Sequence, residues 1–189
     1  VKMIKYHQTE TTIKNTMNNT KHVITGGPGI GKSTVINLLA ERGFHTVPEA
    51  ARYVIEREQR LGTTSLPWLN LSSFQRLVMD RQLEMEAVLP HRITIFLDRG
   101  LIDGLGYCAK AGIEAPLRLT ELSQGRYSKV FLLDPLPSYE NDSVRVEDAD
   151  EAKLIHRVIS EAYQSFGYEI IKVPVLSPQE RVEYILARI

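Results

Sequence analysis

Residues 23–34 read VITGGPGIGKST, and this stretch decides the fold that we expect for the chain. Its first three residues are apolar or β-branched, as in a buried strand, and the glycines that follow permit a tight turn. Residues 26–33 match the pattern G-x-x-x-x-G-K-[ST] in full, and a helix is predicted from Lys32 onward. Between a strand and a helix, this pattern forms a phosphate-binding loop, or P-loop. The sequence therefore predicts a nucleotide site.

Each part of this loop has a chemical role toward a phosphate chain. Backbone N–H groups and the dipole of the following helix attract the phosphates. Lys32 supplies an ammonium for the β- and γ-phosphates, and Ser33 supplies a hydroxyl ligand for Mg²⁺. We therefore expect ATP as substrate and Mg²⁺ as cofactor, and the absence of an N-K-x-D stretch argues against a guanine-specific switch. The predicted nucleotide-binding residues are Gly26, Gly27, Pro28, Gly29, Ile30, Gly31, Lys32, Ser33 and Thr34.

Beyond the P-loop, strand-like and helix-like segments alternate to the end of the chain. Strands are predicted at 22–25, 45–48, 92–100, 129–135 and 169–175. Helices are predicted at 32–42, 49–60, from Ser72 or Ser73 to just before Pro90, and at 101–111, 116–124, 149–166 and 178–188. Such alternation is typical of a parallel sheet covered by helices on both faces. The expected fold class is α/β: a three-layer P-loop NTPase fold with a five-stranded parallel sheet.

Composition limits the class of protein. The chain has 189 residues, of which 43% are hydrophobic, so we expect one domain at 21–189 after a polar N-terminal arm at 1–20. Lys plus Arg and Asp plus Glu each number 23, which argues against general nucleic-acid binding. No apolar run approaches the roughly 18 residues that span a bilayer. The single cysteine, Cys108, and the absence of a secretory apolar block favour a cytoplasmic protein.

Acidic and basic residues follow two further predicted strands, at the edge where a parallel sheet binds its ligand. The stretch VPEAAR contains Glu49 and Arg52, and FLDRG contains Asp98 and Arg99. Near a γ-phosphate, a carboxylate can hold Mg²⁺ or accept a proton from an acceptor hydroxyl, and an arginine can clamp an oxygen. The alternatives are that Glu49 only favours a helix start and that the Asp-Arg pair lies on the surface.

Other residues admit both a functional and a structural interpretation. Residues 135–148 could close over the transferring phosphate through Arg145, or could form an ordinary polar loop. Gln82, with its neighbour Arg81, interrupts an apolar helix face and marks either a pocket wall or the domain edge. Asp103 and Tyr107 share one helix face and line either the cavity or the surface. Trp68 could stack on a base or cover the core, and a place in the core is expected. The five histidines are expected to have structural roles.

The stretches GGPGIGKST, VPEAAR, FLDRG and FLLDP…VRVED together resemble small P-loop ATPase domains often labelled AAA-type. These domains are similar to ribosylnicotinamide kinases and, more distantly, to deoxynucleoside kinases, and the resemblance spans residues 21–189. It implies that Glu49 is the base toward a sugar hydroxyl and that Gln75, in SSFQR, reads the acceptor's base. It also implies a nucleoside- or nucleotide-kinase-like fold, in which Asp98 and Arg99 match the acid-arginine pair after the third strand.

These observations favour a kinase that moves the γ-phosphate of ATP to a hydroxyl of a nucleoside-like acceptor. The alternative is an ATPase whose hydrolysis serves a partner, because the segment at 135–148 carries one arginine where deoxynucleoside kinases carry a cluster. In the kinase, Ser33 and Asp98 hold the metal. The predicted catalytic residues are Lys32, Glu49, Asp98, Arg99 and Arg145, and the predicted acceptor-binding residues are Glu49, Arg52, Gln75 and Arg99.

Overall fold

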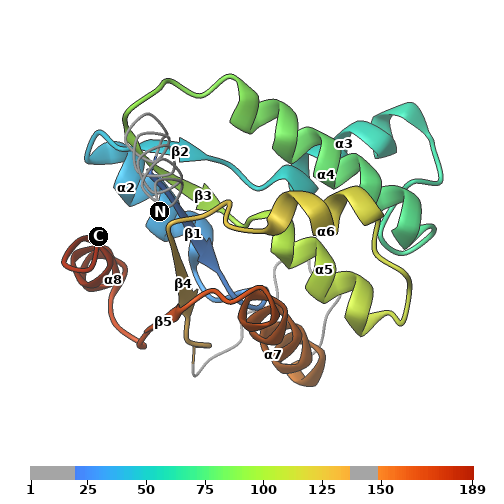
Figure 1. The fold of residues 1–189 in the computed structure, drawn as a ribbon. Helices are drawn as coiled ribbons and strands as arrows, with labels where there is room; N and C mark the ends of the chain where they lie inside the picture. The colour runs from blue at the N-terminus through green and yellow to red at the C-terminus, as the bar shows by residue number, and fades with distance from the viewer. Residues whose placement is uncertain (1–19, 137–148) are drawn as a thin grey trace, which may run out of the picture.

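The computed structural model describes residues 20–136 and 149–189, and these residues form one parallel sheet between two layers of helices (Figure 1). The strands lie in the order β2-β3-β1-β4-β5. The strands are β1 (Thr20–Thr25), β2 (His45–Val47), β3 (Thr94–Asp98), β4 (Lys129–Leu133) and β5 (Ile170–Val173). The helices are α2 (Lys32–Glu41), α3 (Ala50–Leu61), α4 (Leu71–Ala87), α5 (Leu101–Lys110), α6 (Leu117–Ser123), α7 (Ala149–Ser165) and α8 (Pro178–Leu186).

Strand β1 lies at the centre of the sheet because both of its faces are apolar. Val23 and Ile24 are fully buried on opposite faces, as the period of two residues in a strand requires. Ile24 packs with α2 and α8 on one side, and Val23 packs with α5 and α7 on the other. Figure 1 shows these two helical layers on either side of the strands. The predicted three-layer α/β fold with five parallel strands is confirmed.

Several element boundaries differ from the sequence prediction, and local contacts explain three of them. Strand β1 begins at Thr20, which pairs with Thr94 of β3, so Thr20 belongs to the sheet rather than to the arm. Helix α3 begins at Ala50, with Glu49 as its N-cap residue. Helix α4 begins at Leu71 because the Asn70 side chain accepts a hydrogen bond from the Ser73 N–H at 3.1 Å. The predicted start of this helix at Ser72 or Ser73 is therefore one or two residues too late.

The sheet topology places the P-loop directly after the central strand, between the ends of β3 and β4. Residues that follow β2 and β3 therefore reach the same edge of the sheet. Among the described residues, no helix combines the length and hydrophobicity needed to cross a membrane. The proposed lid arginine, Arg145, and the proposed arm up to residue 19 lie outside the described residues.

Candidate active site

The P-loop leads from β1 into the first turn of α2 through Gly31. Gly31 is the N-cap residue of α2 and has a φ of 87°, a left-handed conformation that glycine adopts without steric cost. Because glycine has no side chain to cap the helix, the N–H groups of the first turn are left for an anion. The loop thus has the geometry that phosphate binding requires, as the motif predicts.

Lys32, the first residue of α2, is buried in this loop. Its side-chain Nζ donates a hydrogen bond to the backbone oxygen of Gly27 at 2.6 Å. Burial and the nearby Arg99 guanidinium lower the pKa of Lys32 to about 8. A buried ammonium with one carbonyl partner gains strongly from a phosphate, because an opposite charge compensates for the lost hydration.

Ser33 and Asp98, the two predicted metal ligands, lie together. The Ser33 hydroxyl donates to Asp98 Oδ2 at 2.8 Å, and the Asp98 side chain is almost completely buried. Burial and the Glu49 charge raise the pKa of Asp98. Asp98 Oδ1 is also buried and has no hydrogen-bond partner among the described residues. A hydroxyl beside an unpaired carboxylate oxygen fits Mg²⁺, which takes few protein ligands and keeps several waters.

Glu49 forms an ion pair with Arg99 across the ends of β2 and β3. The Arg99 Nε donates to Glu49 Oε1 at 2.9 Å, and the Glu49 side chain makes no capping bond to α3. Burial works to raise the pKa of Glu49, but the charges of Arg99 and Lys32 outweigh burial and lower it. The carboxylate is therefore ionised near neutral pH and can accept a proton. A helix-start role alone does not explain this geometry.

Asp103 of α5 fixes the position of Arg99. Its carboxylate accepts hydrogen bonds from Arg99 Nη1 at 2.8 Å, from the Thr25 hydroxyl at 2.6 Å and from the Tyr163 hydroxyl at 2.7 Å. The Gly100 N–H donates to the same group at 3.0 Å. Arg99 Nη1 also donates to a P-loop carbonyl, that of residue 26, at 3.0 Å. Asp103 therefore couples α5, β1 and α7 to the predicted catalytic arginine.

One cavity of about 820 Å³ extends from the P-loop along α3, α4 and α5. All four predicted acceptor-binding residues line it, namely Glu49, Arg52, Gln75 and Arg99. Tyr107 and Gln82 line it as well, so the cavity interpretation holds for both. Trp68 also lines the cavity and is 55% exposed, so its predicted place in the core is wrong. Trp68 lies in the connection between α3 and α4, which lies beside the cavity instead of under the sheet.

Two residues that the sequence analysis did not select contact the P-loop from other helices. Arg181 of α8 is 2% exposed and donates to the backbone oxygens of Ile30, Asp134 and Pro174 at 2.6, 3.0 and 3.2 Å. His156 of α7 accepts a hydrogen bond from the Gly27 N–H at 3.2 Å. The sequence signal for Arg181 is weak: it is a charged residue beside Val182 on the face of α8 that is otherwise apolar.

Comparison with models of protein families assigns the chain to a family. The model of a family described as AAA domain matches residues 21–181. The chain belongs to this AAA domain family. The comparison with curated proteins gave no match. The resemblance found in the sequence motifs is thereby confirmed at the level of the family.

Solved structures place this AAA domain among P-loop kinase folds. NadR in complex with NR has a TM-score of 0.66 at 15% identity, and the match covers 97% of this chain but only 57% of the NadR chain. Thymidylate kinase from Ehrlichia chaffeensis has a TM-score of 0.63 at 14% identity, covering 90% and 98% of the two chains. Deoxyadenosine kinase from M. mycoides has a TM-score of 0.56 at 14% identity, covering 89% and 98%. These likenesses show that the fold of the chain is that of P-loop kinases.

Proposed function

We propose that this AAA domain is a kinase that transfers the γ-phosphate of ATP to a hydroxyl of a nucleoside-like acceptor. The main support is the continuous cavity that joins the P-loop to Glu49 and to the wall formed by α3, α4 and α5. A site that only hydrolyses ATP needs no second compartment of this size beyond the phosphate loop. NadR and thymidylate kinase share this fold, and the NadR structure is in complex with NR, which supports an acceptor of this kind.

The residues of this site divide the reaction between them. The acceptor hydroxyl attacks the γ-phosphorus, its proton passes to the ionised Glu49, and ADP leaves with the former bridging oxygen. Lys32 neutralises charge that moves toward the leaving oxygen. Ser33 and Asp98 would hold Mg²⁺, which supplies further charge neutralisation when bound. Arg99 orients Glu49 and also contacts the acceptor, which Arg52 and Gln75 bind. In this proposal Arg145, outside the described residues, covers the transferring phosphate.

Product analysis tests this proposal directly. The protein is incubated with γ-labelled ATP, Mg²⁺ and a panel of nucleosides, other ribosides and nucleotides. We expect label on an acceptor and ADP release that the acceptor accelerates. Label found only as free phosphate for the whole panel would contradict the kinase proposal and favour the alternative, an ATPase that serves a partner.

Glu49→Gln tests the role of the base. The change keeps size and polarity but removes the basic oxygen, so we expect ATP affinity to persist while transfer falls by roughly 10²–10⁴-fold, the usual contribution of a positioned base. Asp98→Asn should instead raise the Mg²⁺ concentration needed for half-maximal rate. Glu41→Gln, on the exposed side of α2, is the control and should leave both quantities unchanged. Transfer at the normal rate by Glu49→Gln would remove the base from the mechanism.

A further inference from the structure

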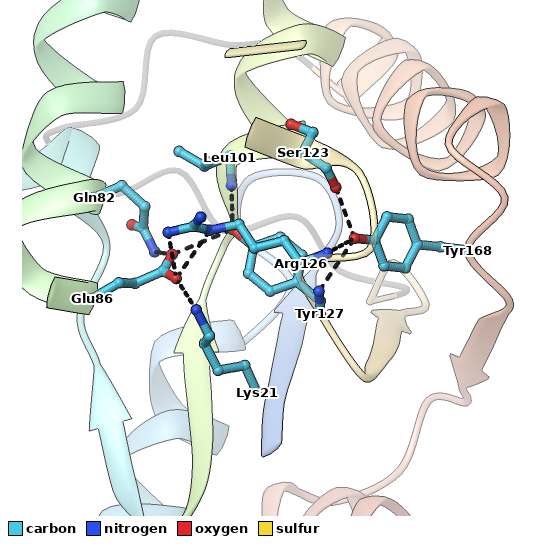
Figure 2. Close-up of polar contacts among 8 residues, drawn as sticks. All are labelled: Lys21, Gln82, Glu86, Leu101, Ser123, Arg126, Tyr127 and Tyr168. Carbon is cyan, nitrogen blue, oxygen red and sulfur yellow. Dashed lines mark hydrogen bonds and ion pairs between the residues drawn. The ribbon is translucent and has the colours of Figure 1, made fainter. Parts of the chain in front are cut away.

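Gln82 forms part of the cavity wall, and Glu86 holds its amide from behind (Figure 2). Both residues belong to α4 and face the same side of the helix, since they are one turn apart. Gln82 is 4% exposed and Glu86 is 8% exposed. The Gln82 Nε2 donates a hydrogen bond to Glu86 Oε1 at 3.0 Å.

Glu86 is surrounded by hydrogen-bond donors from two other parts of the chain, namely β1 and the segment before β4, as Figure 2 shows. Its Oε2 accepts hydrogen bonds from Lys21 Nζ at 2.7 Å and from Arg126 Nε at 3.1 Å, and Arg126 Nη2 forms an ion pair with it at 2.9 Å. The Tyr127 hydroxyl approaches Oε1 at 3.4 Å. Two cations thus neutralise a buried carboxylate, which in its ionised form can only accept hydrogen bonds.

This arrangement fixes the orientation of the Gln82 amide. A glutamine in a pocket can ordinarily rotate its amide by half a turn and present either the carbonyl or the NH₂ group. Here a rotated amide would place its oxygen against the carboxylate oxygens of Glu86 and lose the hydrogen bond at that end. The Gln82 Oε1 makes no hydrogen bond within residues 20–136 and 149–189, so it remains as an acceptor for a molecule in the cavity.

We propose that Gln82, positioned by Glu86, selects acceptor molecules whose buried end carries an N–H or O–H donor. The inference rests on the proposed function and names the class of its substrate: heterocyclic ribosides with at least one N–H on the ring system. The apolar side chains of Phe74 and Met79 line the same cavity and offer a bound ring no hydrogen bond, whereas Gln75 is a second amide of the lining, from which the variants below separate Gln82. A bound ring that presents only acceptor atoms would leave Gln82 Oε1 buried and unpaired, which is costly.

Two pairs of ribosides test this selection, because the members of each pair differ only in the presence of a donor. Adenosine is compared with purine riboside, and cytidine with pyrimidin-2-one riboside, since the second member of each pair has no N–H on its ring. Calorimetry gives the dissociation constants, and labelled ATP gives kcat/KM for transfer. We expect at least one donor-bearing riboside to bind roughly tenfold or more tightly than its donor-free counterpart.

Two variants separate Gln82 from other groups in the cavity. Gln82→Met keeps the length of the side chain without its polar atoms, and the preference should fall below about threefold. In Glu86→Gln, the new amide can form a hydrogen bond with either the oxygen or the nitrogen of the Gln82 amide, so the orientation is no longer fixed. The preference for donor-bearing ribosides should therefore fall in this variant as well. Glu84→Gln is the control, because Glu84 lies on the same helix with its side chain 64% exposed and should keep the normal preference.

The outcomes distinguish this inference from the proposed function. Ribosides that bind or react without preference, or a preference that persists in Gln82→Met, would overturn the inference and leave the kinase proposal intact. If no riboside binds or accepts phosphate, the proposed function and the inference fail together. Glu86→Gln leaves two partly buried cations without their anion, so the folding of this variant is checked by a thermal melt. If the variant does not fold, Gln82→Met alone decides.

Discussion

Lys32 is a residue at which burial and ligand binding oppose each other. With its pKa lowered to about 8, the free protein loses this charge as pH rises through that value, whereas bound phosphates restore it. ATP binding must then take up a proton at higher pH. We therefore expect the dissociation constant of MgATP to rise roughly tenfold between about pH 7 and about pH 9.

Equilibrium titration across this pH range measures the effect of the Lys32 pKa. Lys32→Arg is the control, since a guanidinium stays charged at every pH used and its profile should be flat. A wild-type profile that is equally flat would show that the ammonium keeps its ordinary pKa in the free protein.

Asp103 is a second residue whose chemistry can be tested by a single atom change. All four of its partners donate hydrogen bonds, so the NH₂ group of an asparagine would face at least one donor. We expect Asp103→Asn to lower the free energy of unfolding by about 2–4 kcal/mol and to reduce transfer more than ATP binding, because Arg99 loses a charged partner. Denaturant titration checks the stability, with the half-exposed Asp80→Asn as the control.

Helix α8 reaches the site through one side chain, Arg181, although the helix itself lies against the sheet on the α2 side. Its guanidinium joins three segments that follow β1, β4 and β5 by donating to a carbonyl in each. A lysine has no planar fork and can satisfy only part of this set. The helix therefore contributes to the shape of the P-loop without containing a sequence motif.

Arg181→Lys tests this connection between elements. We expect the free energy of unfolding to fall by about 2–4 kcal/mol and ATP affinity to weaken, since the Ile30 carbonyl is no longer held. Chemical denaturation and ATP titration measure the two effects. Arg188→Lys provides the comparison, because Arg188 is an exposed residue just after α8 and should tolerate the same change. Equal behaviour of the two variants would mean that the P-loop needs no support from α8.

The stability of the whole molecule should depend on His22 in the central strand. His22 lies against the rings of Phe96 and Phe131, with centroid distances of 5.4 and 6.1 Å. Burial, assisted by the charge of Lys129, lowers its pKa from 6.5 to about 4. Between these values the unfolded chain binds more protons, so stability rises with pH. The contribution of His22 to the free energy of unfolding is complete above about pH 6.5. It decreases by about 3 kcal/mol as the pH falls toward 4.

Unfolding measured at several pH values between about 4 and 7 tests this dependence. His22→Leu should flatten the profile, since the variant has no imidazole to protonate. His45→Leu is the matched control, because His45 is exposed in β2 and its removal should leave the slope unchanged. The same slope in His22→Leu and the normal protein would assign the acid sensitivity to carboxylates instead.

The sequence by itself determined the fold and the edge of the sheet at which the site lies. A strand, a glycine-rich loop and a helix in direct succession have local geometry that few other structures accept, so residues 23–34 were sufficient for the P-loop. The alternation of apolar strands with helices then required parallel strands, whose carboxyl ends meet at one edge. Glu49 and Asp98 could be placed there from their positions after two strands.

Only the tertiary structure decided how these residues pair. A helix-start position describes the backbone of Glu49, but its carboxylate turns to Arg99, which lies fifty residues further along the chain. Arg181 and Glu86 take their roles from partners on other elements, so no local pattern marks them. Local sequence fixes backbone conformation through neighbours along the chain, whereas a buried charge is positioned by the groups that compensate it, and packing alone brings those groups together.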